Sequence, residues 1–311
     1  MTLRLARRRD STGSWHSRPL TQDSTADHKR NMKPCSEHVP SARRGFTLVE
    51  LLAVVAMLGV LATMLAPTMA RTKPSSAPFQ CLNNLRQLAF AWKMYADDNN
   101  GGLVYNRDGG NAGKQSGSEA WVGGFLDFTA NPDNTNTALL IDHNKYPYGA
   151  FLGPYIKTPL AFKCPADRST ALMAGGAKPR VRSISMNNFV GTGSRTWNTP
   201  SRNPLCTKFD QIKLPGYMFV LLDEREDSIN DGCFLTDPDT RYALIDYPAS
   251  YHSNAGAFSF ADGHAELHHW KDRRTMPALQ PGQVLPLNVN LPGDVDVLWL
   301  AQHAAGVVSY P

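Results

Sequence analysis

Several signatures of enzymes are missing from this sequence. It contains no nucleophile elbow, no phosphate-binding loop and no paired-carboxylate motif, so we do not expect an enzyme. It also contains no CxxC pair, which argues against a zinc ribbon or a thioredoxin-like redox site.

Excess positive charge is missing from most of the chain. Ten of the 32 Lys and Arg residues fall within residues 1–45, against four of the 27 Asp and Glu residues. Residues 46–311 therefore hold 22 basic and 23 acidic residues, a balance that gives no reason to expect nucleic-acid binding. A basic segment in front of a membrane span is typical of the cytoplasmic side, where we expect residues 1–45 to stay.

Long apolar runs are rare too, since only Phe46–Ala66 is long enough to cross a bilayer as a helix. Glu50 is its one ionisable residue, and a carboxylate in hydrocarbon costs at least a few kcal/mol and needs a partner. Cleavage after Gly45 would provide one, the new α-amino group of Phe46, either within the chain or on a neighbouring copy. The second pairing would make Glu50 a device that sets the stagger between packed helices.

Two plainer interpretations compete for this segment. An ordinary single-pass anchor has the same apolar run but needs neither Gly45 nor Glu50. A secretory signal peptide cut after Ala70 would release a soluble domain, although a glutamate disfavours that use.

Residues Gly45–Leu52, Gly-Phe-Thr-Leu-Val-Glu-Leu-Leu, resemble the class III signal of type IV pilins and type II secretion pseudopilins. The resemblance implies cleavage after Gly45 by a prepilin peptidase, methylation of Phe46 by the same enzyme, and assembly guided by Glu50. Pro67 lies where many pilins have a helix-kinking proline.

The expected fold is α+β and pilin-like, with a long N-terminal helix packed on an antiparallel sheet. We expect a cleaved cytoplasmic leader at 1–45, for which Met32 is an alternative start. A transmembrane helix at 46–70 follows, then its amphipathic continuation at 71–100 and a periplasmic head at 101–311. Within 71–100 the apolar residues recur every three or four positions, as in a helix with one buried face: Leu82, Leu85, Ala89, Trp92 and Ala96.

Four cysteines follow the apolar run, on the expected periplasmic side of the membrane, where disulfides persist. Four cysteines allow three pairings. We expect Cys81–Cys164 first and Cys206–Cys233 second.

A β-hairpin is expected at 257–268, because apolar alternation surrounds Asp262-Gly263, a dipeptide typical of a type I′ turn. His252 completes a His-x9-Asp-Gly pattern. That pattern resembles the C-terminal signature of large pilin-like families of planctomycete- and verrucomicrobium-type bacteria. Three further segments resemble the same families: 81–88, 162–165 and 185–188.

The sequence offers two candidate metal sites, each with a plainer alternative. His264, Glu266 and His268 alternate along one strand and could bind zinc or another transition metal, or simply form a polar outer face. His252 with Asp262 could act as an acid–base pair, or His252 could hydrogen-bond to close the hairpin. The acidic residues of 223–239 could hold Ca²⁺, or form a solvated loop.

The resulting hypothesis is a pseudopilin-like subunit of a periplasmic fibre in type II secretion or a related system. Its partners would be a prepilin peptidase, other pseudopilin subunits, the inner-membrane assembly platform and the lipid bilayer. It would be a single-pass inner-membrane protein with its head in the periplasm or at the cell surface. An alternative is a binding protein or adhesin that uses the pilin signal for delivery. A metal-dependent periplasmic enzyme is a third hypothesis, based only on the histidine face.

Overall fold

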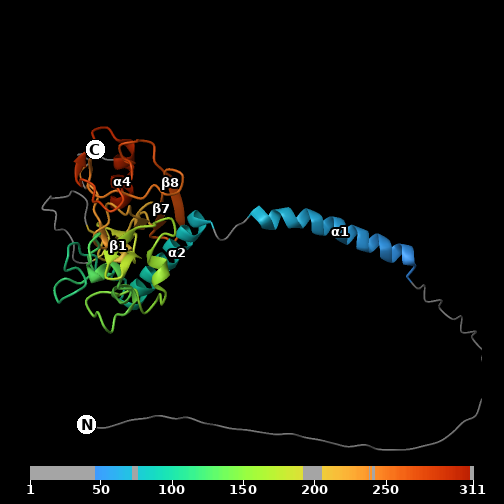
Figure 1. The fold of residues 1–311 in the computed structure, drawn as a ribbon, viewed down its shortest axis with the longest axis horizontal. Coiled ribbons are helices and arrows are strands. Elements are labelled where there is room, and N and C mark those ends of the chain that lie inside the picture. Colours follow the sequence, from blue (N-terminus) through green and yellow to red (C-terminus); the bar gives the residue numbers. More distant parts are fainter. Residues whose placement is uncertain (1–45, 72–75, 192–204, 238, 240–241, 309–311) are drawn as a thin grey trace, which may run out of the picture. The chain divides into compact units, whose positions relative to one another are not determined.

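The computed structural model describes residues 46–71, 76–191, 205–237, 239 and 242–308 (Figure 1). The predicted leader with Gly45, and the short stretch 72–75, lie outside the described residues. The chain divides into two compact units, Met1–Ala66 and Pro67–Pro311.

Helix α1 spans Leu48–Arg71, so the backbone remains helical through Pro67. The large apolar side chains from Phe46, just before the helix, to Leu61 are exposed, Phe46 itself by 85%. Within the described part of the chain, no helix has the combined length and apolar character needed to cross a membrane.

Helix α2 spans Ala77–Asp98, inside the stretch where the sequence pattern predicts a helix. Pro78 stands in its first turn, where a missing N–H costs nothing. The helix ends at Asp98 with Asn99 as its C-cap, and Gly101 follows with φ +77°, a conformation that glycine adopts without steric cost. The predicted apolar face is largely buried, with Leu85 fully covered, and the neighbouring Leu88 is fully covered too. Burial of each such leucine contributes about 1.5–3 kcal/mol.

The head is built on a five-stranded sheet with the order β5-β3-β4-β7-β8. All neighbours are antiparallel except β3 and β5. The strands are β3 (Ile184–Asn187), β4 (Phe219–Asp223), β5 (Cys233–Phe234), β7 (Ala255–Phe260) and β8 (Ala265–His269). The central strand, β4, is buried along its whole length, as its continuous apolar sequence predicts. A helix followed by mixed helices and antiparallel strands agrees with the predicted α+β class.

Smaller elements surround this sheet. Strand β1 (Thr170–Met173) pairs with β2 (Gly176–Pro179), and β6 (Ala243–Leu244) pairs with β9 (Val289–Asn290). The short helices are η1 (Pro132–Thr135), α3 (Ala138–Ile141), η2 (Pro159–Phe162) and η3 (Phe209–Gln211). Helix α4 (Val295–Ala305) is the last element of the described chain. The stretch around Trp121 has no regular secondary structure.

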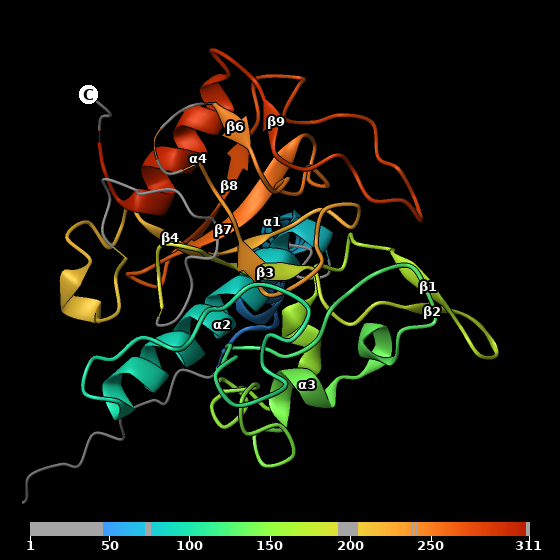
Figure 2. The same ribbon diagram turned by 90° about the vertical axis from the view of Figure 1, so that its left-hand side faces the viewer.

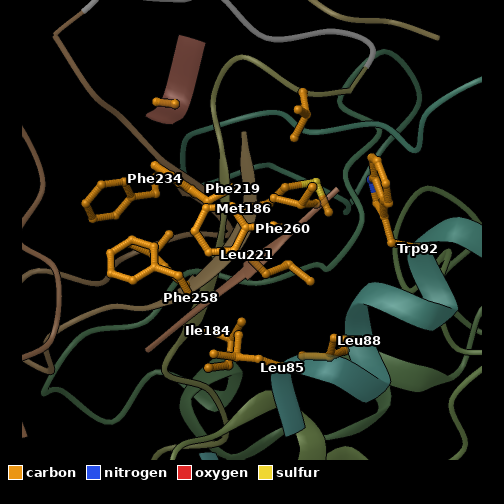
Figure 3. Close-up of a cluster of buried hydrophobic side chains, with 14 of the residues drawn as sticks. Leu85, Leu88, Trp92, Ile184, Met186, Phe219, Leu221, Phe234, Phe258 and Phe260 are labelled. Atoms are coloured by element: carbon orange, nitrogen blue, oxygen red, sulfur yellow. The ribbon is translucent and has the colours of Figure 1, made fainter. Parts of the chain in front are cut away.

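Helices α2 and α4 cover opposite faces of the sheet (Figure 2). Phe258 packs edge-on against Trp299 of α4, with ring centroids 5.1 Å apart. Leu85, Leu88 and Trp92 of α2 enclose the strands from the other side (Figure 3).

A register shift in β4 decides which side chains face α2. Phe219 pairs with Phe260, but Leu221 pairs with Ser259, so one residue between them is bulged. A bulge reverses the alternation of side chains. Phe219 therefore lies on the α4 face, whereas Leu221 and Asp223 lie on the α2 face.

The predicted hairpin forms between β7 and β8, but its turn is not type I′. The N–H of Gly263 donates to the carbonyl of Phe260, and the N–H of Phe260 donates to the carbonyl of His264. Only Gly263 has a positive φ, +99°, whereas a type I′ turn needs two such residues. The connection is therefore a three-residue loop, a type I turn followed by a glycine bulge.

Candidate functional site

The first candidate site is the start of α1, where Thr47 and Glu50 cap the helix reciprocally. The Glu50 carboxylate accepts hydrogen bonds from the Thr47 backbone N–H at 2.9 Å and from its hydroxyl at 3.0 Å. The Glu50 N–H donates in return to the Thr47 hydroxyl at 3.2 Å. This is a capping box, which satisfies two backbone donors at the helix start. The Thr-x-x-Glu spacing was visible in the sequence, yet the sequence interpretation considered only an amine as the partner of Glu50.

The second candidate site is a buried cluster of two thiols, a carboxylate and an imidazole. One ligand-type atom from each side chain lies within 4.8 Å of all the others. Among the described residues this is the one group of three or more His, Cys, Asp or Glu side chains that converge in this way. We call it the four-residue cluster: Cys81, Cys164, Asp223 and His252.

Four separate segments supply these side chains. Cys81 lies in the second turn of α2, and Asp223 ends β4 on the face turned towards α2. Cys164 follows η2, and its N–H donates to the Ser183 hydroxyl at 2.9 Å. His252 precedes a tight turn in which two consecutive residues, 253 and 254, have positive φ.

Three contacts define the geometry of the cluster. Cys164 Sγ lies 3.3 Å from His252 Nε2, and Cys81 Sγ lies 3.8 Å from Asp223 Oδ2. His252 Nε2 lies 4.0 Å from the same Asp223 oxygen. All four side chains are buried, His252 being 4% exposed and the other three 0%.

The cluster concentrates negative charge on one thiol. The hydrogen bond from the Cys81 thiol lowers the pKa of Cys164 to about 5, with help from His252. The same hydrogen bond, together with burial, raises the pKa of Cys81 well above its usual range. Burial and the neighbouring Cys164 charge raise the pKa of Asp223.

The cluster is not arranged as a catalytic triad. In a triad the imidazole uses one ring nitrogen for the nucleophile and the other for the acid. Here Cys164 Sγ and Asp223 Oδ2 both face Nε2 of His252.

The two predicted disulfides are not formed, because Cys81, Cys164, Cys206 and Cys233 are all free, buried thiols. The first predicted pair does lie side by side, but each thiol also faces another polar group of the cluster. The second pair lies on separate elements: Cys233 in β5 aligns with Met186, and Cys206 forms a parallel bridge with Val190. The first prediction missed the polar groups that meet the two sulfur atoms, and the second paired cysteines that the fold places on separate elements.

The predicted metal set His264, Glu266 and His268 is not gathered into a ligand group. His264 stacks on Phe260 and its Nδ1 lies 2.6 Å from Asp262 Oδ1. His268 turns to α4, where its ring stacks on Trp299 with centroids 3.6 Å apart. The sequence alternation predicts that these residues share one face of the strand. In the structure the two histidine rings stack on different aromatic side chains, His264 on Phe260 and His268 on Trp299.

His252 and Asp262 do not form the acid–base pair considered above. They flank the six residues of β7, and a strand rises about 3.3 Å per residue, so the two side chains belong to opposite ends of the strand. His252 belongs to the four-residue cluster, whereas Asp262 accepts hydrogen bonds within the turn that contains Gly263.

The acidic segment 223–239 does not gather as a calcium site within the described residues. Asp227 forms a paired hydrogen bond with the buried Arg225, with two N···O distances of 2.8 Å. Asp231 accepts backbone N–H groups, including that of Gly109 at 2.6 Å. The segment is therefore largely buried rather than a solvated loop, and these two carboxylates have protein partners.

One comparison with known proteins matched. Residues 40–66 match the family model of the prokaryotic N-terminal methylation motif, which covers Gly45, Phe46 and Glu50. No curated protein and no solved structure matches the chain.

The matched motif defines a class, that of proteins with a type IV pilin-like N-terminal signal. It indicates a substrate of a prepilin peptidase and suggests membrane anchoring. The resemblance drawn from Gly45–Leu52 is thus confirmed for the signal.

Proposed function

We propose that this protein is a pseudopilin-like subunit, cut after Gly45 by a prepilin peptidase and assembled into a periplasmic fibre of type II secretion or a related system. The observation that carries the proposal is the methylation motif over residues 40–66. Glu50 lies inside that motif and is the one ionisable residue of the run 46–66, whose described apolar side chains are exposed.

The apolar surface of α1 supports assembly in a membrane. A helix that is apolar all round needs lipid or other helices around it. We assign the segment beginning at Phe46 to the inner membrane, with residues 1–45 in the cytoplasm and the head in the periplasm or at the cell surface. In the fibre, neighbouring subunits would replace lipid around the same side chains.

Glu50 has two roles in this proposal. In the single subunit it completes the capping box with Thr47. During assembly its carboxylate pairs with the new α-amino group of Phe46 on a neighbouring subunit, which sets the stagger between subunits.

Two substitutions separate these roles. Glu50→Gln removes the charge but retains a side chain that can complete a capping box. Thr47→Ala removes the capping hydroxyl and retains the charge. We expect Glu50→Gln to lower the amount of fibre at least about tenfold, equivalent to 1.4 kcal/mol, and Thr47→Ala to leave it near wild type. The reverse pattern would mean that Glu50 acts only as a cap.

Processing has its own test, N-terminal mass spectrometry of the protein from its native membrane. A chain that begins at methylated Phe46 supports the proposal. A chain that begins at Arg71 would mean a released soluble head, and the proposed assembly through Glu50 would be wrong.

A displayed binding protein is the second candidate function, favoured by the size of the unit Pro67–Pro311 and by an open cleft in it. The cleft measures about 450 Å³ and is lined by residues from α2 and from 160–167. Correct processing with a monomeric product, insensitive to Glu50→Gln, would favour this function over a fibre.

A further inference from the structure

The four-residue cluster brings two sulfur atoms, one imidazole nitrogen and one carboxylate oxygen to a common centre. These are the atoms with which proteins bind Zn²⁺. We propose that the cluster binds one Zn²⁺ ion in a closed tetrahedral site that fastens α2 to the sheet of the head.

The distances within the cluster fit a tetrahedron around such an ion. Zinc–ligand bonds of about 2.0–2.3 Å place neighbouring ligand atoms about 3.3–3.8 Å apart. The three contacts measured here are 3.3, 3.8 and 4.0 Å, and no pair of ligand atoms exceeds 4.8 Å. A pair at the 4.8 Å limit would have to close by about 1 Å, roughly half an ångström for each atom, to reach coordination.

Neighbouring groups already hold the ligands in place. The Ser183 hydroxyl donates to Asp223 Oδ1 at 2.7 Å, which leaves Oδ2 facing the centre of the cluster. The same hydroxyl accepts from the N–H of Cys164, so Ser183 fixes two ligands at once. The N–H of Ala166 lies 3.4 Å from Cys164 Sγ and donates to it. Such outer hydrogen bonds orient the ligands of metal sites.

A closed site is structural rather than catalytic, because all four positions of the ion are taken by the protein. The cleft beside α2 has Cys164 in its wall, so the cluster lies next to this cleft. Zinc is favoured over calcium or magnesium because thiolate ligands suit softer ions.

A disulfide between Cys81 and Cys164 is the competing chemistry. It would leave Asp223 Oδ2 buried beside two sulfur atoms that donate no hydrogen bond, with only His252 at 4.0 Å. A buried carboxylate oxygen without a donor is costly, whereas a bound Zn²⁺ would coordinate Oδ2 and offset two of the three negative charges of the carboxylate and both thiolates.

The ion would join segments that are far apart in the chain. Cys81 and Asp223 are separated by 142 positions, and Cys164 and His252 by 88. Zinc would therefore connect α2, β4 and the loops beside them at one point. This proposal is independent of the fibre function, because it concerns only the head.

The test is the metal content of the full chain, purified in detergent under reducing conditions. Elemental analysis is expected to find one Zn²⁺ per chain, falling below about a tenth in Cys164→Ser and in His252→Gln. Cys233→Ser is the matched control, since Cys233 is also a buried free thiol but lies outside the cluster, and it should retain the ion. Ser183→Ala should weaken zinc binding about 10–100-fold while all four ligands remain.

A second measurement does not depend on folded variants. Wild-type protein stripped of zinc and given Co²⁺ should develop the visible absorption of tetrahedral cobalt and a sulfur-to-metal charge-transfer band. Three results would overturn the proposal: neither zinc nor cobalt binding by the reduced wild type, zinc retained in full by the folded ligand variants, or a Cys81–Cys164 disulfide peptide in the native protein.

Discussion

The Nε2 atom of His252 lies 3.3 Å from Sγ of Cys164, although 88 positions separate the two residues. This contact divides the His-x9-Asp-Gly pattern into two parts with different roles. His252 belongs to the buried cluster at one end of β7, whereas Asp262 and Gly263 form the turn at the other end. The spacing of the pattern is therefore the length of the strand and its two flanking loops.

Substitution of Gly263 should weaken the turn without affecting the cluster. At φ +99° a side chain is strained, although the nearest atom to an added Cβ, on Phe90, lies 3.6 Å away. We expect Gly263→Ala to lower the free energy of unfolding by about 1–2 kcal/mol, and Gly263→Asn to lower it less, since asparagine tolerates positive φ better.

Urea denaturation of the full chain in detergent, followed by tryptophan fluorescence, measures this difference. Zinc content should stay the same in both variants. Equal stability of wild type and Gly263→Ala would contradict the assigned turn.

The sequence predicts features that depend on neighbours in the chain. The apolar run of β4, the hairpin around Asp262-Gly263 and the buried face of α2 all follow from local patterns, and the structure has them. The four-residue cluster was not predicted, because its members come from four segments and meet only after the sheet has formed. The bulge in β4, which turns Asp223 towards Cys81, also has no local signal.

The prediction for Cys81 and Cys164 was only partly right, because it too could not include contacts between distant segments. The pairing of Cys81 with Cys164 correctly predicted neighbours, but not that Asp223 and His252 would join them. The Thr-x-x-Glu signature at Thr47 is different, since it is local and could have been found.

Free thiols at Cys206 and Cys233 give a second prediction. Alkylation of the unfolded, unreduced protein, followed by digestion and mass spectrometry, should modify both residues completely. Each is buried in the native chain, so both should react slowly before unfolding. A peptide that joins the two cysteines would show that the predicted disulfide forms after all.

Helix α4 depends on Asp294, which precedes its first residue. The carboxylate accepts the N–H groups of Asp296 at 2.9 Å and Val297 at 3.2 Å, and it is fully buried. It also accepts the Thr275 hydroxyl at 3.2 Å. We expect Asp294→Ala to lower the free energy of unfolding by about 2 kcal/mol, the upper end of the range for lost caps.

Asp294→Asn is the matched control, because its side-chain oxygen still caps the helix. Thermal or urea unfolding should place it between wild type and Asp294→Ala. Equal losses in the two variants would show that the charge, not the cap, is what matters.

His268 should make the head less stable in mild acid. Burial against the aromatic side chains lowers the pKa of His268 to about 4, from an ordinary value of 6.5, and its Nε2 is buried without a hydrogen-bond partner. The nearby cationic or ionisable groups Lys271, His269 and His303 act in the same direction. The unfolded chain therefore takes up a proton at a higher pH than the folded chain does. The stability that His268 contributes is complete above pH 6.5 and is lost as the pH falls towards 4.

Because the ring is partly exposed, solvent screening reduces the effect of the pKa shift on stability. We expect the free energy of unfolding to fall by on the order of 1 kcal/mol. His268→Phe retains a ring to stack on Trp299 and removes the titration, so its stability should fall less than that of wild type between pH 6.5 and pH 4. Part of the fall should remain, because burial also lowers the pKa of His303. Urea titrations at several pH values measure both proteins. Parallel pH profiles would mean that His268 is protonated without cost in the folded head, which the stacking on Trp299 at 3.6 Å argues against.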